Sequence, residues 1–293
     1  MKKVAVINDL SGFGKCSLTA AIPVLSAMGV QCCPLPTAVL TGQTGYKYYH
    51  CLDLTDMVPN YIDAWKKNDV TFDAIYTGYV TGNEQLTKIS QFVDEFRTDK
   101  TYFVVDPVMG DDGRVYSMFN EQLLEGMKVL SRKANLITPN LTEACLLSDS
   151  DVQRVICLGK KADLLPVAEE IGHNLRALAK EENGVEQDVV ITGIKCRDDA
   201  FVYNLAVTAN GVELSKSHFF DVSFSGTGDL FASVMTGAKM RGLSTKSAMD
   251  LAGKFIYHSI ADTMNEELEP MAGVHFEEYL IELIKGVESH GKE

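Results

Sequence analysis

The sequence lacks any long hydrophobic run. After Met1-Lys2-Lys3 no apolar stretch is long enough for a signal peptide, and nothing in the 293 residues approaches the length of a membrane span. We therefore expect a cytoplasmic protein with no membrane contact. Positive charge is also scarce, because 27 Lys and Arg stand against 40 Asp and Glu, a formal net charge of −13. DNA or RNA binding depends on clustered Lys and Arg, so the composition argues against nucleic acid as the main partner.

The cysteines lack the spacing of a metal site or a disulfide framework. All 7 are scattered along the chain, and no two of them form a C-x-x-C pair. We therefore expect reduced, mostly buried thiols rather than disulfides or a zinc site. Internal repeats and low-complexity tracts are absent as well. The remaining composition, 46% hydrophobic and 23% charged, is typical of a soluble globular protein.

The first glycine-rich turn lacks both common nucleotide-binding signatures. The apolar run Val4-Ala5-Val6-Ile7 predicts a strand, and residues 8–15 predict a glycine-bearing turn after it. A P-loop needs Gly and then Ser or Thr at two positions that hold Asp9 and Cys16 here. The dinucleotide fingerprint also fails, because Ser17 stands in place of its third Gly.

What the sequence does contain is a regular alternation of apolar runs and amphipathic segments. This βαβα order predicts an α/β protein with a mostly parallel sheet and helices on both faces. Asn210-Gly211 between two β-like runs adds an antiparallel hairpin. The expected strands are 4–7, 36–40, 72–76, 102–105, 136–137, 189–191, 200–206 and 212–220, and the expected helices are 18–28, 83–96, 121–132, 244–260 and 276–287.

Polar residues follow several of these strands, at the edge where open α/β sheets bind ligands. Asp106 comes directly after a fully apolar strand, and a carboxylate there suits Mg²⁺. For Asp111 and Asp112 a simple turn is a serious alternative. Asn140 and Glu143 can face the same crevice, and they also fit a helix-capping arrangement. The loops 41–46 and 77–79 follow two further strands and are candidate ligand loops or plain surface turns.

The stretch Ser223-Phe224-Ser225-Gly226-Thr227-Gly228-Asp229 runs directly into a helix. Its glycines let the backbone approach a ligand closely, and the first amides of a helix favour an anion. Asp229 lies in the first turn, where we expect the helix dipole to keep its carboxylate ionised as a base. On this stretch alone, a common glycine-rich helix start is an equally good interpretation.

Three strand-end motifs together resemble the ribokinase-like superfamily and its vitamin-kinase branch. They are 106–111 (Asp-Pro-Val-Met-Gly-Asp), Thr138-Pro139-Asn140 with Glu143, and Gly226-Thr227-Gly228-Asp229. Their order spans nearly the whole chain, which implies a single kinase domain over residues 1–293. Ser11-Gly12, Thr44-Gly45-Tyr46 and Thr77-Gly78-Tyr79 resemble pyridoxal kinases in particular. The resemblance implies Mg²⁺- and ATP-dependent phosphorylation of the 5′-hydroxymethyl group of pyridoxal, pyridoxamine or pyridoxine, the salvage of vitamin B6, by a homodimer.

The resemblance also implies roles for individual residues. Asp229 takes the hydroxyl proton, and the three residues before it form the anion hole for the transferring phosphoryl group. The other implied contacts are Ser11, Thr44 and Tyr79 to the pyridine ring, Asp106 and Glu143 to Mg²⁺, and Asn140, Thr192, Gly193, Gly226, Thr227 and Gly228 to the nucleotide.

Two departures from the family pattern leave details open. Phe224 replaces a small polar residue before the glycine motif, which bears on nucleotide or monovalent-cation contacts, and Gln43 replaces a His, which bears on the preferred vitamer. Hydroxymethylpyrimidine kinase is the main rival, but its family has Cys where this chain has Asp229. A vitamer- or nucleotide-binding regulator on the same fold is a second alternative, and a retained base argues against it.

Overall fold

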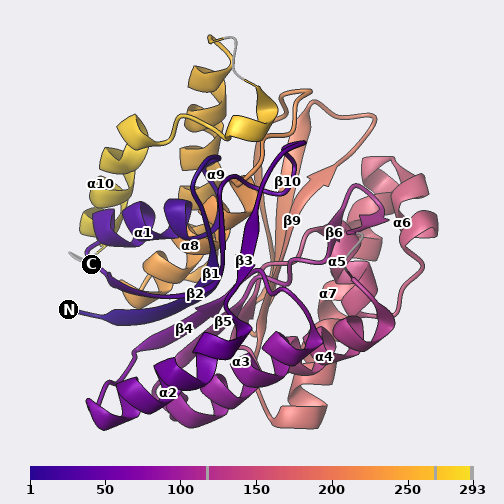
Figure 1. Ribbon diagram of the computed structural model, residues 1–293. Helices are drawn as coiled ribbons and strands as arrows, with labels where there is room; N and C mark the ends of the chain where they lie inside the picture. The colour runs from indigo at the N-terminus through magenta and orange to yellow at the C-terminus, as the bar shows by residue number, and fades with distance from the viewer. Residues whose placement is uncertain (117–118, 267–268, 291–293) are drawn as a thin grey trace. The chain divides into compact units, whose positions relative to one another are not determined.

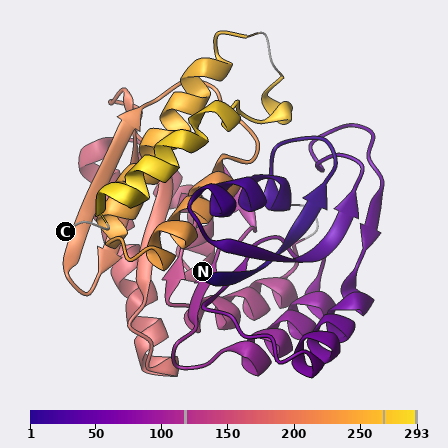
Figure 2. The same cartoon turned by 90° about the vertical axis from the view of Figure 1, so that its left-hand side faces the viewer.

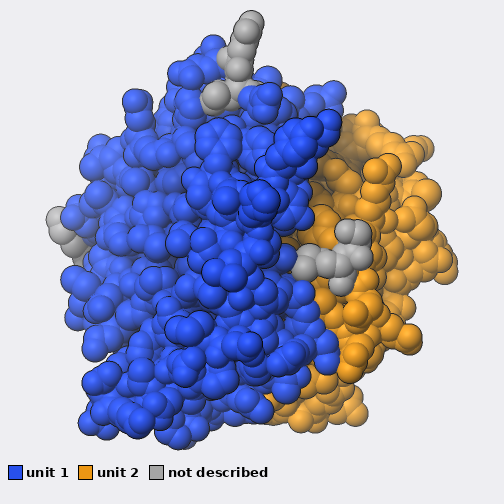
Figure 3. Space-filling model, in the orientation of Figure 1, with its two compact units in different colours: residues 1–102, 220–293 blue, residues 103–219 orange. Residues whose placement is uncertain are grey.

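The structure is a computed structural model that describes residues 1–116, 119–266 and 269–290, with the side chain of His290 left out. It divides the chain into two compact units, which Figure 3 shows in different colours. Unit 1 comprises residues 1–102 and 220–293, and unit 2 comprises residues 103–219. One kinase domain over 1–293 stays a prediction.

Unit 1 contains strands β1 (Lys3–Ser11), β2 (Gln31–Leu40), β3 (Cys51–Asp53) and β4 (Ala74–Thr77) in the order β4-β1-β2-β3. β1 pairs in parallel with β2 and β4, and β3 adds an antiparallel edge to β2. The sequence prediction ended the first strand at Ile7, and this is wrong. β1 continues to Ser11 opposite Leu40, past a register shift between Asn8 and Leu10, because its polar residues are satisfied by buried hydrogen bonds.

The helices of unit 1 cover both faces of these strands. Figures 1 and 2 show α1, α8, α9 and α10 on one face and α2 and α3 on the other. Ser244 caps α9 as predicted, because its side chain accepts a hydrogen bond from Ser247 N. The bounds are α1 Ser17–Ala27, η1 Thr55–Met57, α2 Val58–Lys67, α3 Asn83–Phe96, α8 Thr227–Met240, α9 Thr245–Thr263, η2 Pro270–Ala272, η3 Glu277–Tyr279 and α10 Leu280–His290.

Unit 2 combines parallel and antiparallel strands. β5 (Tyr102–Val105), whose first residue belongs to unit 1, pairs in parallel with β8 (Leu136–Ile137), and β8 with β9 (Asp188–Lys195). β10 (Phe201–Thr208) and β11 (Gly211–His218) form the predicted antiparallel hairpin. The remaining elements are the hairpin β6 Gly110–Asp111 and β7 Arg114–Val115, and helices α4 Glu121–Arg132, α5 Leu141–Leu147, α6 Val152–Leu158 and α7 Lys161–Asn183.

The α/β class with mostly parallel strands flanked by helices is therefore confirmed. The four strands β1, β4, β5 and β8 lie almost entirely in the core, as their near-continuous apolar runs predicted. In the part of the chain that the structure describes, no helix has the length and apolar character needed to cross a bilayer.

Candidate active site

The glycine motif of unit 1 forms the start of α8. Gly226 is the N-cap residue with φ +82°, and a Cβ there would collide with the backbone carbonyl of Lys15. Gly228 faces open space, and Thr227 Oγ1 donates to Phe224 O at 3.1 Å. The first amides of α8 are thus held in a tight turn, which suits an anion. Phe224 is only 6% exposed, so it is a core side chain of the turn before α8.

Asp229 lies in the first turn of α8 and is held by β1 and α1. Asn8 Nδ2 donates to Asp229 Oδ1 at 3.1 Å, and the backbone N–H of Ser17 also donates to the carboxylate. Burial, reinforced by the charge of Asp9, raises the pKa of Asp229 to about 6. Desolvation therefore outweighs the helix dipole, which was expected to favour the ionised form, and the net shift of the pKa is upward. At neutral pH the group is still mostly a carboxylate, with the pKa of an effective base.

A second buried carboxylate, Asp9, lies beside Asp229. Ser11 Oγ donates to Asp9 Oδ2 at 2.8 Å, and Ser17 Oγ donates to Asp9 Oδ1 at 2.5 Å. Burial raises the pKa of Asp9 despite these bonds, and burial next to both carboxylates raises the pKa of the Cys16 thiol to about 12. The cluster concentrates negative charge where water is excluded, so a hydrogen-bonding substrate can interact strongly with it.

The residues predicted to hold the pyridine ring all belong to unit 1. Tyr79 N donates to Asn8 Oδ1 at 2.9 Å, and burial together with Cys51 and Asp9 raises the pKa of the Tyr79 hydroxyl. Ser11 is buried, and its hydroxyl is engaged by Asp9. Thr44 is exposed in the loop after β2. Direct contact of these residues with a ring stays a prediction.

Gln43 fixes the loop that carries Thr44. Its Oε1 accepts a hydrogen bond from Gly45 N at 2.8 Å, and its Nε2 donates to the carbonyl of Met271 at 3.1 Å. Other carbonyl oxygens of η2 accept from Lys15 N at 3.2 Å and from Ser225 N at 3.1 Å. The short helix η2 thus joins three loops, including the one that leads into α8. Gln43 has a structural role that its place in the sequence did not reveal.

Unit 2 gathers the predicted metal-binding carboxylates. Asp106 Oδ1 accepts a hydrogen bond from Thr138 Oγ1 at 2.9 Å. Glu143 accepts from Met109 N at 3.0 Å and from Asn140 N at 2.9 Å. Burial and the charge of Asp106, reinforced by Asp111, raise the pKa of Glu143 well above its usual range. Several desolvated carboxylates in one place fit a divalent cation, because the cation compensates their charge.

The described residues contain no group of three or more His, Cys, Asp or Glu arranged to hold a metal by themselves. Two carboxylates with water and phosphate oxygens are a common Mg²⁺ environment, so the donor set of Asp106 and Glu143 fits that ion. Asp111 and Asp112 lie in the tight β6–β7 hairpin, where Asp112 has φ +46°. The backbone of Asp111 and Asp112 therefore fits the interpretation that they form a simple turn.

The predicted nucleotide residues of unit 2 also lie together. Asn140 caps α5 in a reciprocal arrangement with Glu143, as predicted, and its Nδ2 donates to Gly110 O at 2.7 Å. Asn140 and Thr192 form an isolated parallel bridge, which places β9 beside the start of α5. Gly193 has φ +66°, and its N–H donates to Asn204 Oδ1 at 3.0 Å.

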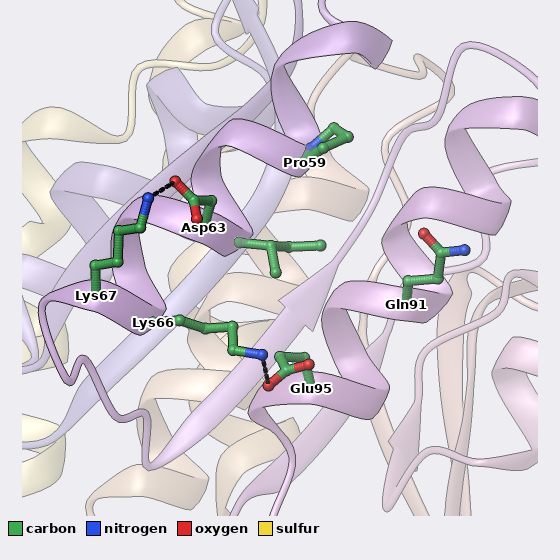
Figure 4. Close-up of a pocket in the computed structure, with 7 residues that line it drawn as sticks. Pro59, Asp63, Lys66, Lys67, Gln91 and Glu95 are labelled. Carbon is green, nitrogen blue, oxygen red and sulfur yellow. Dashed lines mark hydrogen bonds and ion pairs between the residues drawn. The ribbon is translucent and has the colours of Figure 1, made fainter.

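A hollow of about 620 Å³ on α2 and α3 involves none of these residues (Figure 4). Two ion pairs lie on its rim, Lys67 with Asp63 at 2.8 Å and Lys66 with Glu95 at 2.6 Å. Exposed ion pairs contribute little and are common on helix surfaces, so the hollow has no evident role in the site.

Comparison with known proteins decides the family. The family model for phosphomethylpyrimidine kinases matches residues 14–272. The chain belongs to this family. The family match, together with similar proteins named as pyridoxal kinases, confirms the resemblance to the pyridoxal kinases of the ribokinase-like superfamily.

Three similar proteins illustrate the likeness. A Bacteroides thetaiotaomicron protein assigned as a phosphomethylpyrimidine kinase, in an orthorhombic crystal form with pyridoxal, is 38% identical, with a TM-score of 0.88 over 96% of this chain and 95% of that one. The pyridoxal kinase from Lactobacillus plantarum is 27% identical, with a TM-score of 0.85 and 99% of each chain covered. The pyridoxine/pyridoxal/pyridoxamine kinase of Bordetella avium is 26% identical over 86% of this chain and 82% of its own length.

Sequence reasoning missed two residues of the unit 1 cluster, Asn8 and Asp9. They were assigned to a turn, where Asn and Asp are common for backbone reasons. The available signal was two polar residues directly after a buried apolar strand, and it becomes informative only when the strand is known to extend to Ser11.

We predict that Gly226→Ala lowers the free energy of unfolding by at least about 2 kcal/mol, because the new Cβ meets the Lys15 carbonyl at a positive φ. Gly228→Ala is the matched control, since a Cβ there meets no atom within 4 Å. Chemical denaturation measures both variants. Equal stabilities of the two variants would contradict the close approach of the two turns.

We also predict that Asp229→Asn stabilises the protein at pH 8 by about 1–3 kcal/mol, because the ionised carboxylate is desolvated there. The folded-state pKa of about 6 lies above the ordinary aspartate value of 3.8, so this cost is present above about pH 6 and disappears as the pH falls from 6 toward 4. Denaturation from pH 4 to 8 tests the trend, with the exposed Asp63→Asn as control. A gain that does not change with pH would contradict the raised pKa.

Proposed function

We propose that the protein is an ATP-dependent kinase of B6 vitamers, acting on the 5′-hydroxymethyl group of pyridoxal, pyridoxamine or pyridoxine. The observation that carries the proposal is Asp229, a desolvated carboxylate with a pKa of about 6 directly after Gly226-Thr227-Gly228. The 38% identical relative in a crystal form with pyridoxal, and the relatives named as pyridoxal kinases, supply the substrate class.

In the proposed reaction the vitamer hydroxyl oxygen attacks the γ-phosphorus of ATP. The O–H proton passes to Asp229, the new P–O bond forms, and ADP leaves with the electrons of the broken bond. The first amides of α8 stabilise negative charge on the transferring group, because a helix N-terminus presents donors and a positive dipole end. Proton transfer is favourable at neutral pH, since Asp229 is ionised there but retains a raised proton affinity.

The residues of unit 2 have their own proposed roles. Asp106 and Glu143 hold Mg²⁺, which neutralises phosphate charge when bound. Asn140, Thr192 and Gly193 bind the nucleotide. A cytoplasmic homodimer is the proposed form of the enzyme.

The deciding experiment is ATP-dependent turnover of the three B6 vitamers and of hydroxymethylpyrimidine. We expect turnover of at least one B6 vitamer in preference to hydroxymethylpyrimidine, because Asp229 occupies the position that holds Cys in the rival family. Preference for hydroxymethylpyrimidine would move the assignment to thiamine biosynthesis, which the name of the matched family also allows. If none of the four compounds is phosphorylated, the alternative of a vitamer- or nucleotide-binding regulator would be favoured.

For the base, we expect Asp229→Asn to lower kcat by roughly 10²–10⁴-fold with ATP binding largely kept, because only proton transfer is lost. Steady-state kinetics and nucleotide titration measure the two quantities. Asp262→Asn, also in unit 1, serves as a charge-matched control. Near-normal turnover of Asp229→Asn would remove this role.

For the metal, we expect Asp106→Ala or Glu143→Ala to raise the Mg²⁺ concentration for half-maximal rate by about tenfold or more, because a hard oxygen ligand is lost. A Mg²⁺ titration of the rate measures this, with the exposed Asp163→Ala of α7 as control. An unchanged titration would leave the two carboxylates with a structural role only.

A further inference from the structure

Asn8 is a fully buried side chain at an irregular point of β1. The parallel ladder between β1 and β4 runs from Val4 to Ile7, and Gly78 N closes it on Ile7 O at 2.9 Å. On the other side, the pairing with β2 shifts register just after Asn8. Asn8 is thus the last residue of β1 in the regular register with β2, and it lies one residue beyond the end of the β1–β4 ladder.

The amide of Asn8 makes three hydrogen bonds in a defined orientation. Its Oδ1 accepts from Tyr79 N at 2.9 Å and from Asp9 N at 3.0 Å, and its Nδ2 donates to Asp229 Oδ1 at 3.1 Å. The two backbone N–H groups require an oxygen, so the assignment of oxygen and nitrogen follows from the donors. The Asn8 amide thus connects the backbone N–H groups of Tyr79 and Asp9 with the Asp229 carboxylate at the start of α8.

Gly78 makes room for this amide. A Cβ at Gly78 would lie 2.5 Å from Asn8 Nδ2 and 2.8 Å from its Cγ. Side chains essentially never approach so closely, and the buried Asn8 has little space to move. Only a glycine at position 78 leaves room for the Asn8 amide in this position.

The Asn8 amide is an uncharged donor that lies beside the acidic side chains Asp9 and Asp229. The titratable groups that face Asp229 are Asp9 on β1, whose charge opposes ionisation of Asp229, and the Cys16 thiol at the start of α1, which both carboxylates keep neutral by raising its pKa. The Ser17 N–H and Asn8 Nδ2 are the donors that favour its ionised form. A carboxylate side chain rotates readily about its terminal torsion, and a directed donor removes that freedom.

We propose that Asn8 is a positioning residue that holds the Asp229 carboxylate in one orientation and couples it to the Tyr79 side of the vitamer pocket. This inference rests on the proposed function, in which Asp229 is the base. Asn8 acts through Asp229 and Tyr79 and takes no proton itself. The coupling means that displacement of the Tyr79 backbone also disturbs the base.

Asn8→Asp is the sharpest test, because it keeps the shape and an acceptor for Tyr79 N and Asp9 N but removes the donor to Asp229. We expect kcat at pH 7 to fall by about 100-fold or more while KM for pyridoxal changes by less than about threefold. The acid limb of the kcat profile should move to higher pH by about one unit or more, and kcat should partly recover at alkaline pH. Asn60→Asp on α2 adds the same charge at an exposed site and should leave both unchanged.

A measurement without turnover separates this inference from the proposed function. The Asp229 carboxyl is titrated by ¹³C NMR in wild type and Asn8→Asp, and Asp229→Asn identifies its signal. An upward shift of the midpoint supports the inference even if no vitamer is phosphorylated. An unchanged midpoint and an unchanged acid limb would overturn it, and the proposed function would stand if wild type phosphorylates a vitamer.

Gly78→Ala provides a second variant if Asn8→Asp does not fold. It keeps every hydrogen-bonding group and displaces the amide by crowding. We expect the same fall in kcat with KM less affected, and Gly82→Ala, where a Cβ meets nothing within 4 Å, as the unaffected control. Wild-type kcat in folded Gly78→Ala would contradict the positioning role.

Discussion

The Asp229 carboxylate is held at the start of α8 by donors from β1 and from the start of α1, in surroundings that desolvate it. This desolvated charge is costly, and much of the local structure of unit 1 serves to keep it in place. Asn8 of β1 donates to it, Gly78 leaves space for that amide, and Gly226 allows the turn before α8 to approach Lys15. Desolvation of the ionised Asp229 carboxylate lowers the stability of the fold and also raises the pKa of Asp229, and a raised pKa suits a base.

The two carboxylates of the cluster have different surroundings. Both oxygens of Asp9 accept hydroxyl hydrogen bonds, from Ser11 and Ser17, whereas Asp229 is held by an amide and a backbone N–H. Asp229 also keeps some accessible surface, while Asp9 is buried. The arrangement suits one carboxylate that exchanges a proton with a substrate and a second that tunes it. In unit 2 the repulsion between Glu143 and Asp106 fits a cation instead.

Much of the architecture could be predicted because it depends on local patterns. The apolar runs of β5 and β8, the Asn210-Gly211 hairpin, and the capping pair of Asn140 and Glu143 each have a short-range physical cause. The order of three strand-end motifs was sufficient for the family. The glycine motif and Asp229 could be located in the sequence, although the direction of the pKa shift could not, because desolvation depends on residues over 200 positions away.

Asn8 and Asp9 were missed, and the hydrogen bonds of Gln43 were not anticipated, for a related reason. Polar residues after an apolar run look like a turn when only neighbours in the sequence are considered. Their partners, Asp229, Ser17 and Met271, are fixed by tertiary structure, and the hydrogen bonds to them make a buried polar strand end acceptable. Phe224 shows the reverse, since its place beside a ligand motif suggested a functional departure and the structure places it in the core.

The most direct measurement of the central claim is the pH dependence of kcat for the wild-type enzyme at saturating ATP and Mg²⁺, with pyridoxal and pyridoxamine compared. We expect kcat to fall on the acid side with an apparent pKa of about 6, at the same midpoint for both vitamers, because the group that titrates is Asp229. A rate that stays constant from pH 7 down to pH 5, or a midpoint that follows the vitamer, would contradict it.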